Sequence, residues 1–223
     1  MAMRVGRIRE KFGVKWRRGV QFEPVTWPGW RRILWLYENA PAERHRRAFL
    51  AIFFGGFRVS EAIQLQRRQI AIGEDAIVIY SAPVLKYKRR MMRDVLIPND
   101  PENPLFDEYL NYLKHGFKKI DGKWTPVYLI PKTQRFTSEV VPDKPASRKT
   151  VWRWMLEIDE SLFPHLLRSW WAAYLVNRFD FRIPQLQKYF AWKNADVAAH
   201  YVKPRLRELA EKLGVRRIPT LEV

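Results

Sequence analysis

The sequence predicts an α+β fold that is mostly α-helical, with a small antiparallel β-sheet in the first half of the chain. Apolar residues recur at helical spacing in most segments, which is typical of helices with one buried face. Two short β-rich runs, at 76–80 and 93–98, flank a charged connection and indicate a hairpin or meander. The chain has 223 residues, 47% of them apolar, which suffices for the core of one substantial domain.

Three helices are predicted before the β-rich part. The first covers "TWPGWRRILWLYENAP", and we expect Pro28 to open it at the first helical position. The second follows Pro41 over "AERHRRAFLAIFFGGF" and ends at Gly55 and Gly56, because glycine is favoured just past a helix end. The third is expected over "RVSEAIQLQRRQI", where apolar residues as far as Ile70 keep helical spacing.

The β-rich runs "AIVIY" and "RDVLIP" are joined by the basic link "SAPVLKYKRRMM". After them, "PENPLFDEYLNYLKHG" predicts a helix opened by a proline, with an apolar side made by Leu105, Tyr109, Tyr112 and Leu113. The run "TPVYLIP" predicts a third strand. Residues 132–148 are rich in Pro, Ser and Lys, and we expect a loop there.

The rest of the chain is predicted to be helical, with breaks at Phe163-Pro164, at Ile183-Pro184, near Lys193-Asn194 and at Pro204. Within it, "HLLRSWWAAYL" places His165 and Arg168 three residues apart, on one helix face. Both lie in the first turns, where positive side chains oppose the helix dipole at a cost of up to about 1 kcal/mol. An interfacial histidine and a solvated arginine would explain this pair taken alone. A functional site would explain why the cost is accepted.

The charge of the chain points to a polyanionic partner. Lys and Arg total 41 against 23 Asp and Glu, a formal net charge of +18 spread over the whole sequence. Nucleic acid is the partner that this excess favours, and a membrane surface is the other candidate. No apolar run is long enough to span a bilayer and no signal-peptide pattern follows the N-terminal charges, so we expect a cytoplasmic protein.

The composition excludes several kinds of site. Without cysteine, there can be no disulfide framework, thiolate zinc site or cysteine nucleophile. The four histidines, at 45, 115, 165 and 200, show no metal-ligand spacing, so we expect no metal and no cofactor. Ten tryptophans and many charged residues would also suit a protein from a hot environment.

Two further motifs are basic. Arg58 follows two glycines in "GGFRVSEAIQL" and enters a helix, which would hold a guanidinium at a fixed point. Lys86 and Lys88 are two residues apart. They would share one face of the strand predicted at 76–80 if that strand continued as far as these lysines. Taken alone, an exposed arginine at a helix start and a solvated hairpin tip explain these residues.

The order of these motifs resembles the tyrosine recombinase family, also called phage-type integrases. The catalytic domain of that family carries G-x-R-x-S-E, a hairpin lysine before a strand ending in V-P or I-P, H-x-L-R, a His or Trp, and a tyrosine. The matching positions here are Arg58 in "GFRVSE", the hairpin lysine, "HLLR" at 165–168, Trp192, and Tyr201. The resemblance covers roughly residues 25 to 210. It implies the tyrosine recombinase catalytic-domain fold over residues 25–203.

The sequence departs from the family pattern in two places. The family commonly shows L-G-H before its tyrosine, whereas "FAWKNADVAAHY" has Trp192 in the histidine position. A tryptophan offers packing and one hydrogen-bond donor in place of a proton-transfer group. The hairpin link is also longer than usual, and we prefer Lys86 as the catalytic lysine with Lys88 as the alternate.

The resemblance implies a role for each residue. Tyr201 would attack a DNA phosphorus to give a 3′-phosphotyrosyl link and a free 5′-hydroxyl, without metal or nucleotide. Arg58 and Arg168 would hold the nonbridging oxygens. The lysine would protonate the leaving oxygen, and His165 would assist the tyrosine's proton or brace the phosphate. Trp192 would donate to a phosphate oxygen while its ring packs the site.

Other readings of neighbouring residues stay open at this stage. A tyrosine near a helix end usually caps a core with its hydroxyl in water, and only the upstream motifs favour Tyr201 as the nucleophile. Glu61 is expected to brace the helix that Arg58 begins, with an ion pair to an active-site cation as the alternative. His200 is interpreted as incidental.

The segments outside residues 25–203 have their own expectations. Residues 1–24 are basic and predict an arm or linker, and residues 204–223 predict an amphipathic helix and tail. In the family such tails dock onto a neighbouring protomer, so the resemblance implies a homo-oligomer on double-stranded DNA, expected to be a tetramer; the alternative is a helix folded back on its own domain. A separate N-terminal DNA-binding domain usually precedes the catalytic one. A fragment and a minimal member of the family are both compatible with this sequence.

The function predicted from the sequence is integration or excision of a mobile element, virus or plasmid by site-specific recombination. A type IB topoisomerase has a similar residue set, but would relax DNA without a specific site. A noncatalytic DNA-binding relative would bind in a salt-sensitive way and form no covalent product. An RNA-binding module is disfavoured because no aromatic RNA-stacking signature is present.

Overall fold

The computed structural model describes residues 27–85, 91–134, 137 and 139–202. The first helical and β segments are α2 (Trp30–Glu38), α3 (Glu43–Phe53), α4 (Val59–Ala62), the 3₁₀ turn η1 (Arg67–Gln69), β1 (Ile70–Ile72), β2 (Ala76–Val84) and β3 (Met91–Pro98). The following ones are α5 (Phe106–His115), β4 (Lys118–Ile120), β5 (Lys123–Thr125), β6 (Pro131–Thr133) and β7 (Val140–Pro145). The chain then forms α6 (Arg148–Ile158), α7 (Pro164–Phe179), α8 (Ile183–Phe190) and α9 (Ala195–Ala199). The fold is thus α+β and mostly helical, as predicted.

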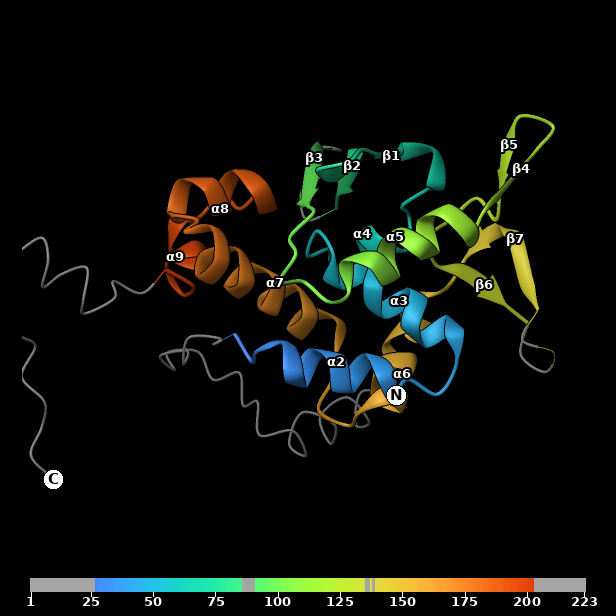
Figure 1. Cartoon of the computed structure of the whole chain (residues 1–223), viewed down its shortest axis with the longest axis horizontal. Helices are drawn as coiled ribbons and strands as arrows, with labels where there is room; N and C mark the ends of the chain where they lie inside the picture. Colours follow the sequence, from blue (N-terminus) through green and yellow to red (C-terminus); the bar gives the residue numbers. More distant parts are fainter. Residues whose placement is uncertain (1–26, 86–90, 135–136, 138, 203–223) are drawn as a thin grey trace, which may run out of the picture.

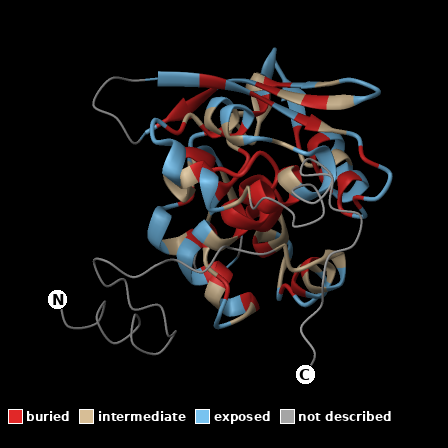
Figure 2. Ribbon diagram, turned by 90° about the vertical axis from the view of Figure 1, so that its left-hand side faces the viewer, coloured by how far each residue is buried: buried red, intermediate tan, exposed pale blue. Residues whose placement is uncertain are grey.

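Helix α7 is the centre of the core. It begins at Pro164, and ten of its residues, from Pro164 to Leu175, are buried. A helix that is apolar nearly all round is buried on most sides, and α3 and α6 both pack against α7. Figure 2 shows the buried residues gathered in the middle of the molecule and the exposed ones on the outer faces of the helices and hairpins.

The predicted hairpin is confirmed as part of a three-stranded antiparallel sheet in the order β1-β2-β3. Ile77 pairs with Ile97 and Ile79 with Val95, and all four side chains are buried. Because side chains alternate between the faces of a strand, the intervening residues of β3 are exposed, as Leu96 shows. In Figure 1 this sheet lies above the helices, while β4–β5 and β6–β7 form two hairpins at one end of the molecule and α8 and α9 lie at the other.

Five local predictions are wrong. Pro28 does not open α2, which begins at Trp30 after Gly29 at φ 81°. The third helix has only four residues, because backbone groups at 65–67 bond to residues 127–129 in place of a further helical turn: Leu129 N–H donates to Leu65 O at 3.0 Å. Ile70 therefore lies in β1.

The other three corrections concern α5 and the segment that follows it. In the run "TPVYLIP" only the end residues belong to strands, Thr125 to β5 and Pro131 to β6, and the residues between them form one isolated bridge, from Tyr128 to Gln66. The sequence predicts a loop over residues 132–148, but β6 and β7 pair as antiparallel strands there, with Lys132 opposite Val141. Helix α5 does bury the predicted side, but Leu105 caps it, so no proline stands at its first position.

Candidate active site

Arg58 is held at the start of α4 by a carboxylate of the same helix. The chain leaves α3 through Gly55 and Gly56, both at positive φ, and turns sharply into α4. Glu61 accepts a hydrogen bond from the Arg58 backbone N–H at 3.0 Å and another from Arg58 Nη1 at 2.7 Å. Glu61 is fully buried, whereas the Arg58 side chain is 20% exposed. The sequence "R-V-S-E" therefore fixes one guanidinium at the surface of the core.

Arg168 reaches the same carboxylate from the first turns of α7. Its Nη1 lies 3.4 Å from Glu61 Oε2 and donates to Gly56 O at 2.6 Å, while Nη2 donates to Phe190 O at 3.3 Å. Arg168 is only 1% exposed, and in the described part of the chain nothing accepts a hydrogen bond from its Nε. This N–H group is left to donate to a water or to a ligand oxygen.

The charges around Arg168 are unbalanced. Burial, followed by the neighbouring charges of Arg58 and Arg93, lowers the pKa of the Arg168 guanidinium well below its ordinary value, and Glu61 acts in the opposite direction. A guanidinium nevertheless stays charged in a protein. Two arginines, Arg58 and Arg168, thus pair with one buried carboxylate, and the charge of Arg93 lies nearby. The cluster has an excess of positive charge that an anion such as a phosphodiester would neutralise.

Tyr201 follows α9 and lies beside the arginine cluster. Its ring stacks on Trp192, with centroids 5.5 Å apart, and Trp192 stacks on Phe190 at 4.5 Å. Its hydroxyl donates to Ser169 Oγ at 3.0 Å, one residue after Arg168. Burial raises the pKa of the Tyr201 phenol, and the Ser169 hydrogen bond and the Arg168 charge counteract part of this rise.

Trp192 connects the tyrosine to the arginines. It is 8% exposed, and the guanidinium carbon of Arg168 lies 5.6 Å from its ring centroid. Its backbone N–H donates to Gln187 O at 2.9 Å, which ties it to the last turn of α8. The structure thus brings Arg58, Arg168, Trp192 and Tyr201 together, as the order of the motifs suggested.

The remaining predicted residues are placed differently. His165 lies in the first turn of α7 and is exposed, whereas Arg168, one turn later, is buried. Lys86 and Lys88 lie outside the described residues. Glu61 both braces the start of α4 and pairs with the two arginines, so the expectation and its alternative are both correct. His200 is exposed.

Sequence reasoning missed Arg93 and Ser169. Arg93 lies on β3 and is 8% exposed, on the same inward side as Val95 and Ile97. Its signal was an arginine at the i, i+2, i+4 spacing of a buried strand face. Ser169 is 6% exposed and touches Tyr201; its position directly after Arg168 was the only sequence signal.

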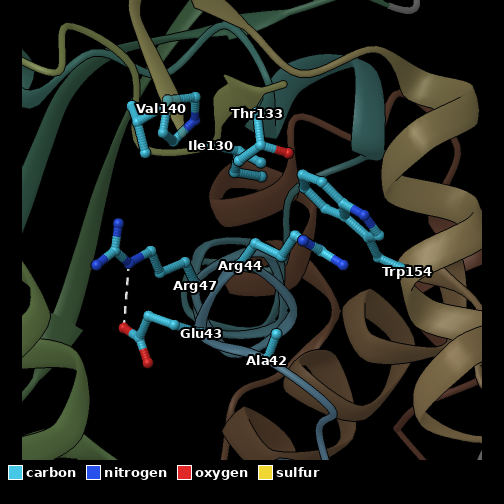
Figure 3. Close-up of a pocket in the computed structure, with 9 residues that line it drawn as sticks. Ala42, Glu43, Arg44, Arg47, Ile130, Thr133, Val140 and Trp154 are labelled. Atoms are coloured by element: carbon cyan, nitrogen blue, oxygen red, sulfur yellow. Dashed lines mark hydrogen bonds and ion pairs between the residues drawn. The ribbon is translucent and has the colours of Figure 1, made fainter. Parts of the chain in front are cut away.

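The structure also contains a pocket of about 280 Å³ away from these residues. It lies between the first turns of α3, the β6–β7 hairpin and α6, and Figure 3 shows Glu43, Arg47 and Trp154 among its walls. Arg47 Nε donates to Glu43 at 3.0 Å, so this pair neutralises itself. None of the predicted site residues lines the pocket. Within the described ranges no group of three or more His, Asp or Glu could hold a metal ion, and no helix is long and apolar enough to cross a membrane.

Comparison with solved structures shows a shared fold. The XerH site-specific recombinase bound to difH substrate matches with a TM-score of 0.51 and 16% identity, covering 83% of this chain and 52% of that one. The XerA recombinase matches at 0.52 and 17%, covering 87% and 66%. A lambda integrase dimer bound to a COC′ core site matches at 0.53 and 16%, covering 93% and 66%. The chain therefore spans between about half and two thirds of the length of these proteins.

Comparison with curated protein sequences gives no match. The model of the phage integrase family, in contrast, matches residues 30–207, which include every predicted site residue. This match covers most of the chain and agrees with the shared fold. The protein therefore belongs to the phage integrase family.

Proposed function

We propose that this chain is the catalytic domain of a site-specific DNA recombinase that cleaves and rejoins DNA through a 3′-phosphotyrosyl intermediate. One observation carries the proposal: Arg58, Arg168 and Tyr201 come from distant parts of the chain and meet through Glu61, Trp192 and Ser169. Family membership and the DNA in the XerH and lambda integrase structures support it.

The proposed mechanism begins with the phosphodiester between the two arginines. Arg58 is partly exposed and Arg168 holds an unused Nε–H, so together they can donate to both nonbridging oxygens. These oxygens gain charge when phosphorus becomes five-coordinate, and donors fixed in advance stabilise that state most. Glu61 keeps both guanidiniums in place, because each of its carboxylate oxygens pairs with one of them.

The nucleophile in this proposal is the Tyr201 hydroxyl oxygen. It forms a bond to phosphorus while the bond to the 5′-oxygen breaks, and the phosphate stays on the protein as a 3′-phosphotyrosine. The phenolic proton leaves toward His165 or solvent, and the 5′-oxygen takes a proton from Lys86, with Lys88 as the alternate. Rejoining reverses these steps, so no external energy source is required.

The architecture around this domain is also a proposal. We assign residues 25–203 to the catalytic domain, 1–24 to a basic arm and 204–223 to a helix and tail. The proposed assembly is a tetramer on double-stranded DNA, in which the tail is exchanged between protomers. Its setting would be a mobile element, virus or plasmid. A structure of the Tn1549 transposon integrase, which matches this chain with a TM-score of 0.54 and 15% identity, supports a mobile element.

Covalent trapping tests the proposal. The protein is incubated with end-labelled nicked duplexes that carry candidate attachment sequences, denatured, and separated by size, with Tyr201→Phe alongside. A nick just 3′ of the scissile phosphate lets the short fragment with the free 5′-hydroxyl diffuse away, so the adduct accumulates. We expect a labelled protein band with the natural chain and none with Tyr201→Phe, although both bind DNA equally. Salt-sensitive binding without an adduct would contradict catalysis and favour a DNA-binding relative. Relaxation of DNA without a specific site would favour a topoisomerase.

A further inference from the structure

Arg93 is a buried cation that the proposed mechanism does not use. It lies on β3, where Nη2 donates to Gly55 O at 3.2 Å and Nη1 donates to Tyr189 O. Gly55 belongs to the turn that leads to Arg58. Tyr189 belongs to the last turn of α8, three residues before Trp192. Arg93 thus joins three segments of the chain that carry or precede residues of the candidate site.

Arg168 joins two of these segments in a parallel way. It donates to Gly56 O and Phe190 O, each one residue after the carbonyl that Arg93 binds. The ring of Phe190 lies 4.8 Å from the guanidinium carbon of Arg168 and 5.7 Å from that of Arg93. Arg93 from β3 and Arg168 from α7 therefore each bridge the Gly55–Gly56 turn and the end of α8.

The surroundings of Arg93 are unfavourable for a charge with a merely structural role. In the described part of the chain no carboxylate forms an ion pair with it, and its Nε has no acceptor. Its guanidinium carbon lies 5.0 Å from the Phe57 ring and 5.7 Å from the Tyr189 ring. It also shares its neighbourhood with two other cations. An apolar side chain of similar volume would avoid the cost of burying this charge.

We propose that Arg93 is a positioning residue of the active site, which holds the Gly55–Gly56 turn against the end of α8 and so fixes Arg58, Arg168 and Trp192 relative to one another. The inference rests on the proposed function. Its charge adds to the positive excess around Glu61, which favours a bound phosphodiester. A planar fork is required, because one group must serve carbonyls of two segments while lying over aromatic rings.

The matched control is Arg67, a second buried arginine with the same kind of surroundings. It is 8% exposed, donates to Leu113 O and Ile70 O, and lies over the rings of Phe117 and Trp124. It contacts none of the candidate site residues. Arg67→Met therefore removes an equivalent buried arginine without touching the proposed site.

The first experiment measures single-turnover cleavage of a nicked duplex at saturating DNA. We expect Arg93→Met to cleave about 100-fold more slowly than the natural chain, the loss typical of a misplacement of about 1 Å in the active site. The cleavage rate of Arg67→Met should stay within about twofold of that of the natural chain, because mutations at distant sites without shared partners rarely affect each other by more. If Arg93→Met fails to fold, Arg93→Lys keeps the charge and loses the fork, and should lower the rate in the same direction. Equal rates for the Arg93 and Arg67 variants would overturn the proposal.

A second substrate distinguishes positioning of the arginines from general loosening. A methylphosphonate at the scissile position replaces one charged nonbridging oxygen with a methyl group, so less charge remains for the arginines to stabilise. The deficit of Arg93→Met relative to the natural chain should then shrink by about tenfold. An unchanged deficit would show that Arg93 does not act through Arg58 and Arg168.

A third readout does not depend on activity. Buried arginine Nε–H groups exchange slowly with water and give NMR signals, and the Arg168 signal is identified by its loss in Arg168→Lys. We expect it to shift or to exchange faster in Arg93→Met and not in Arg67→Met. If the natural chain forms no adduct but this signal responds, the proposed function fails while the positioning link holds. A signal that does not respond overturns the link.

Discussion

At the scale of single residues, the environment of Tyr201 sets the conditions for the proposed cleavage. The phenol is half-buried, and its raised pKa keeps it protonated at neutral pH. Ser169 is the neighbour that acts most directly on the phenol oxygen, because its hydrogen bond lowers that pKa. A group so placed favours the phenolate that forms as Tyr201 attacks.

Ser169→Ala should slow cleavage by about tenfold at pH 7.5, since hydrogen bonds to charged groups contribute about 1.5–3 kcal/mol. Tyr201 donates to Ser169 Oγ as a phenol, and once it loses its proton the Ser169 hydroxyl can turn and donate to the phenolate. Alanine removes that donor, so the pKa of Tyr201 rises further. The deficit should shrink as the pH approaches the phenol's own pKa, and a pH–rate profile checks this. Ser169→Thr keeps the hydroxyl and serves as the control. A deficit independent of pH would indicate a packing effect alone.

At the scale of elements, the Gly55–Gly56 turn sets how the start of α4, with Arg58, lies relative to α7 and α8. Gly56 has φ 56°, and an added Cβ would lie 2.5 Å from Phe190 Cε1 and 2.9 Å from Trp171 Cδ1. These are rings of α8 and α7, the elements that lead to Trp192 and carry Arg168. A side chain at this position would therefore push the turn that leads to Arg58 away from α7, which carries Arg168, and from α8.

Gly56→Ala should destabilise the protein by about 2–4 kcal/mol, of which about 1 kcal/mol comes from the left-handed backbone and the rest from overpacking. The cleavage rate should fall by more than the loss of folded protein accounts for. Gly122→Ala is the matched control, because Gly122 has φ 76° with nothing within 4 Å of the added Cβ, and it should cost only the backbone contribution. Urea unfolding measures both. Similar losses in the two variants would contradict the close packing at the turn.

The sequence predicted most of the elements that position the site. Periodicity and the flanking Gly and Pro residues located α3 and α7, and two β-rich runs around a charged connection located the β2–β3 hairpin. The short α4 was not predictable, because hydrogen bonds between residues 65–67 and 127–129 end it, and such pairing is invisible locally. The inward direction of Arg93 followed only from the register of β3 on β2.

At the scale of the whole molecule, the net charge of +18 should make DNA binding steeply salt-dependent. If about 6–10 phosphates are contacted, affinity should fall about 10³–10⁵-fold between 50 and 200 mM salt. Fluorescence anisotropy with a labelled duplex measures the slope. Tyr201→Phe should give the same slope, because the phenol carries no charge at neutral pH. A nearly flat dependence would contradict recognition through the phosphate backbone.

The buried tyrosines should make the fold sensitive to alkali. Burial raises the pKa of Tyr109, Tyr112 and Tyr174 above the ordinary value, and that of Tyr189 to about 12. Below pH 10 both states keep these protons and stability is unaffected. Above it the unfolded chain loses protons first, so each such tyrosine removes up to about 1.4 kcal/mol per pH unit. Urea midpoints from pH 9 to 11.5 measure the fall, and Tyr189→Phe should reduce its slope. A constant midpoint would contradict this.

The central claim is that Tyr201, next to the arginine cluster, forms the covalent bond to DNA. The most direct measurement is to isolate the covalent adduct, digest both components, and identify the modified peptide by mass spectrometry. We predict a nucleotide joined through its 3′-phosphate to the peptide that contains Tyr201, with a free hydroxyl on the 5′ end of the released strand. A nucleotide on another residue, or a 5′ linkage, would contradict the account.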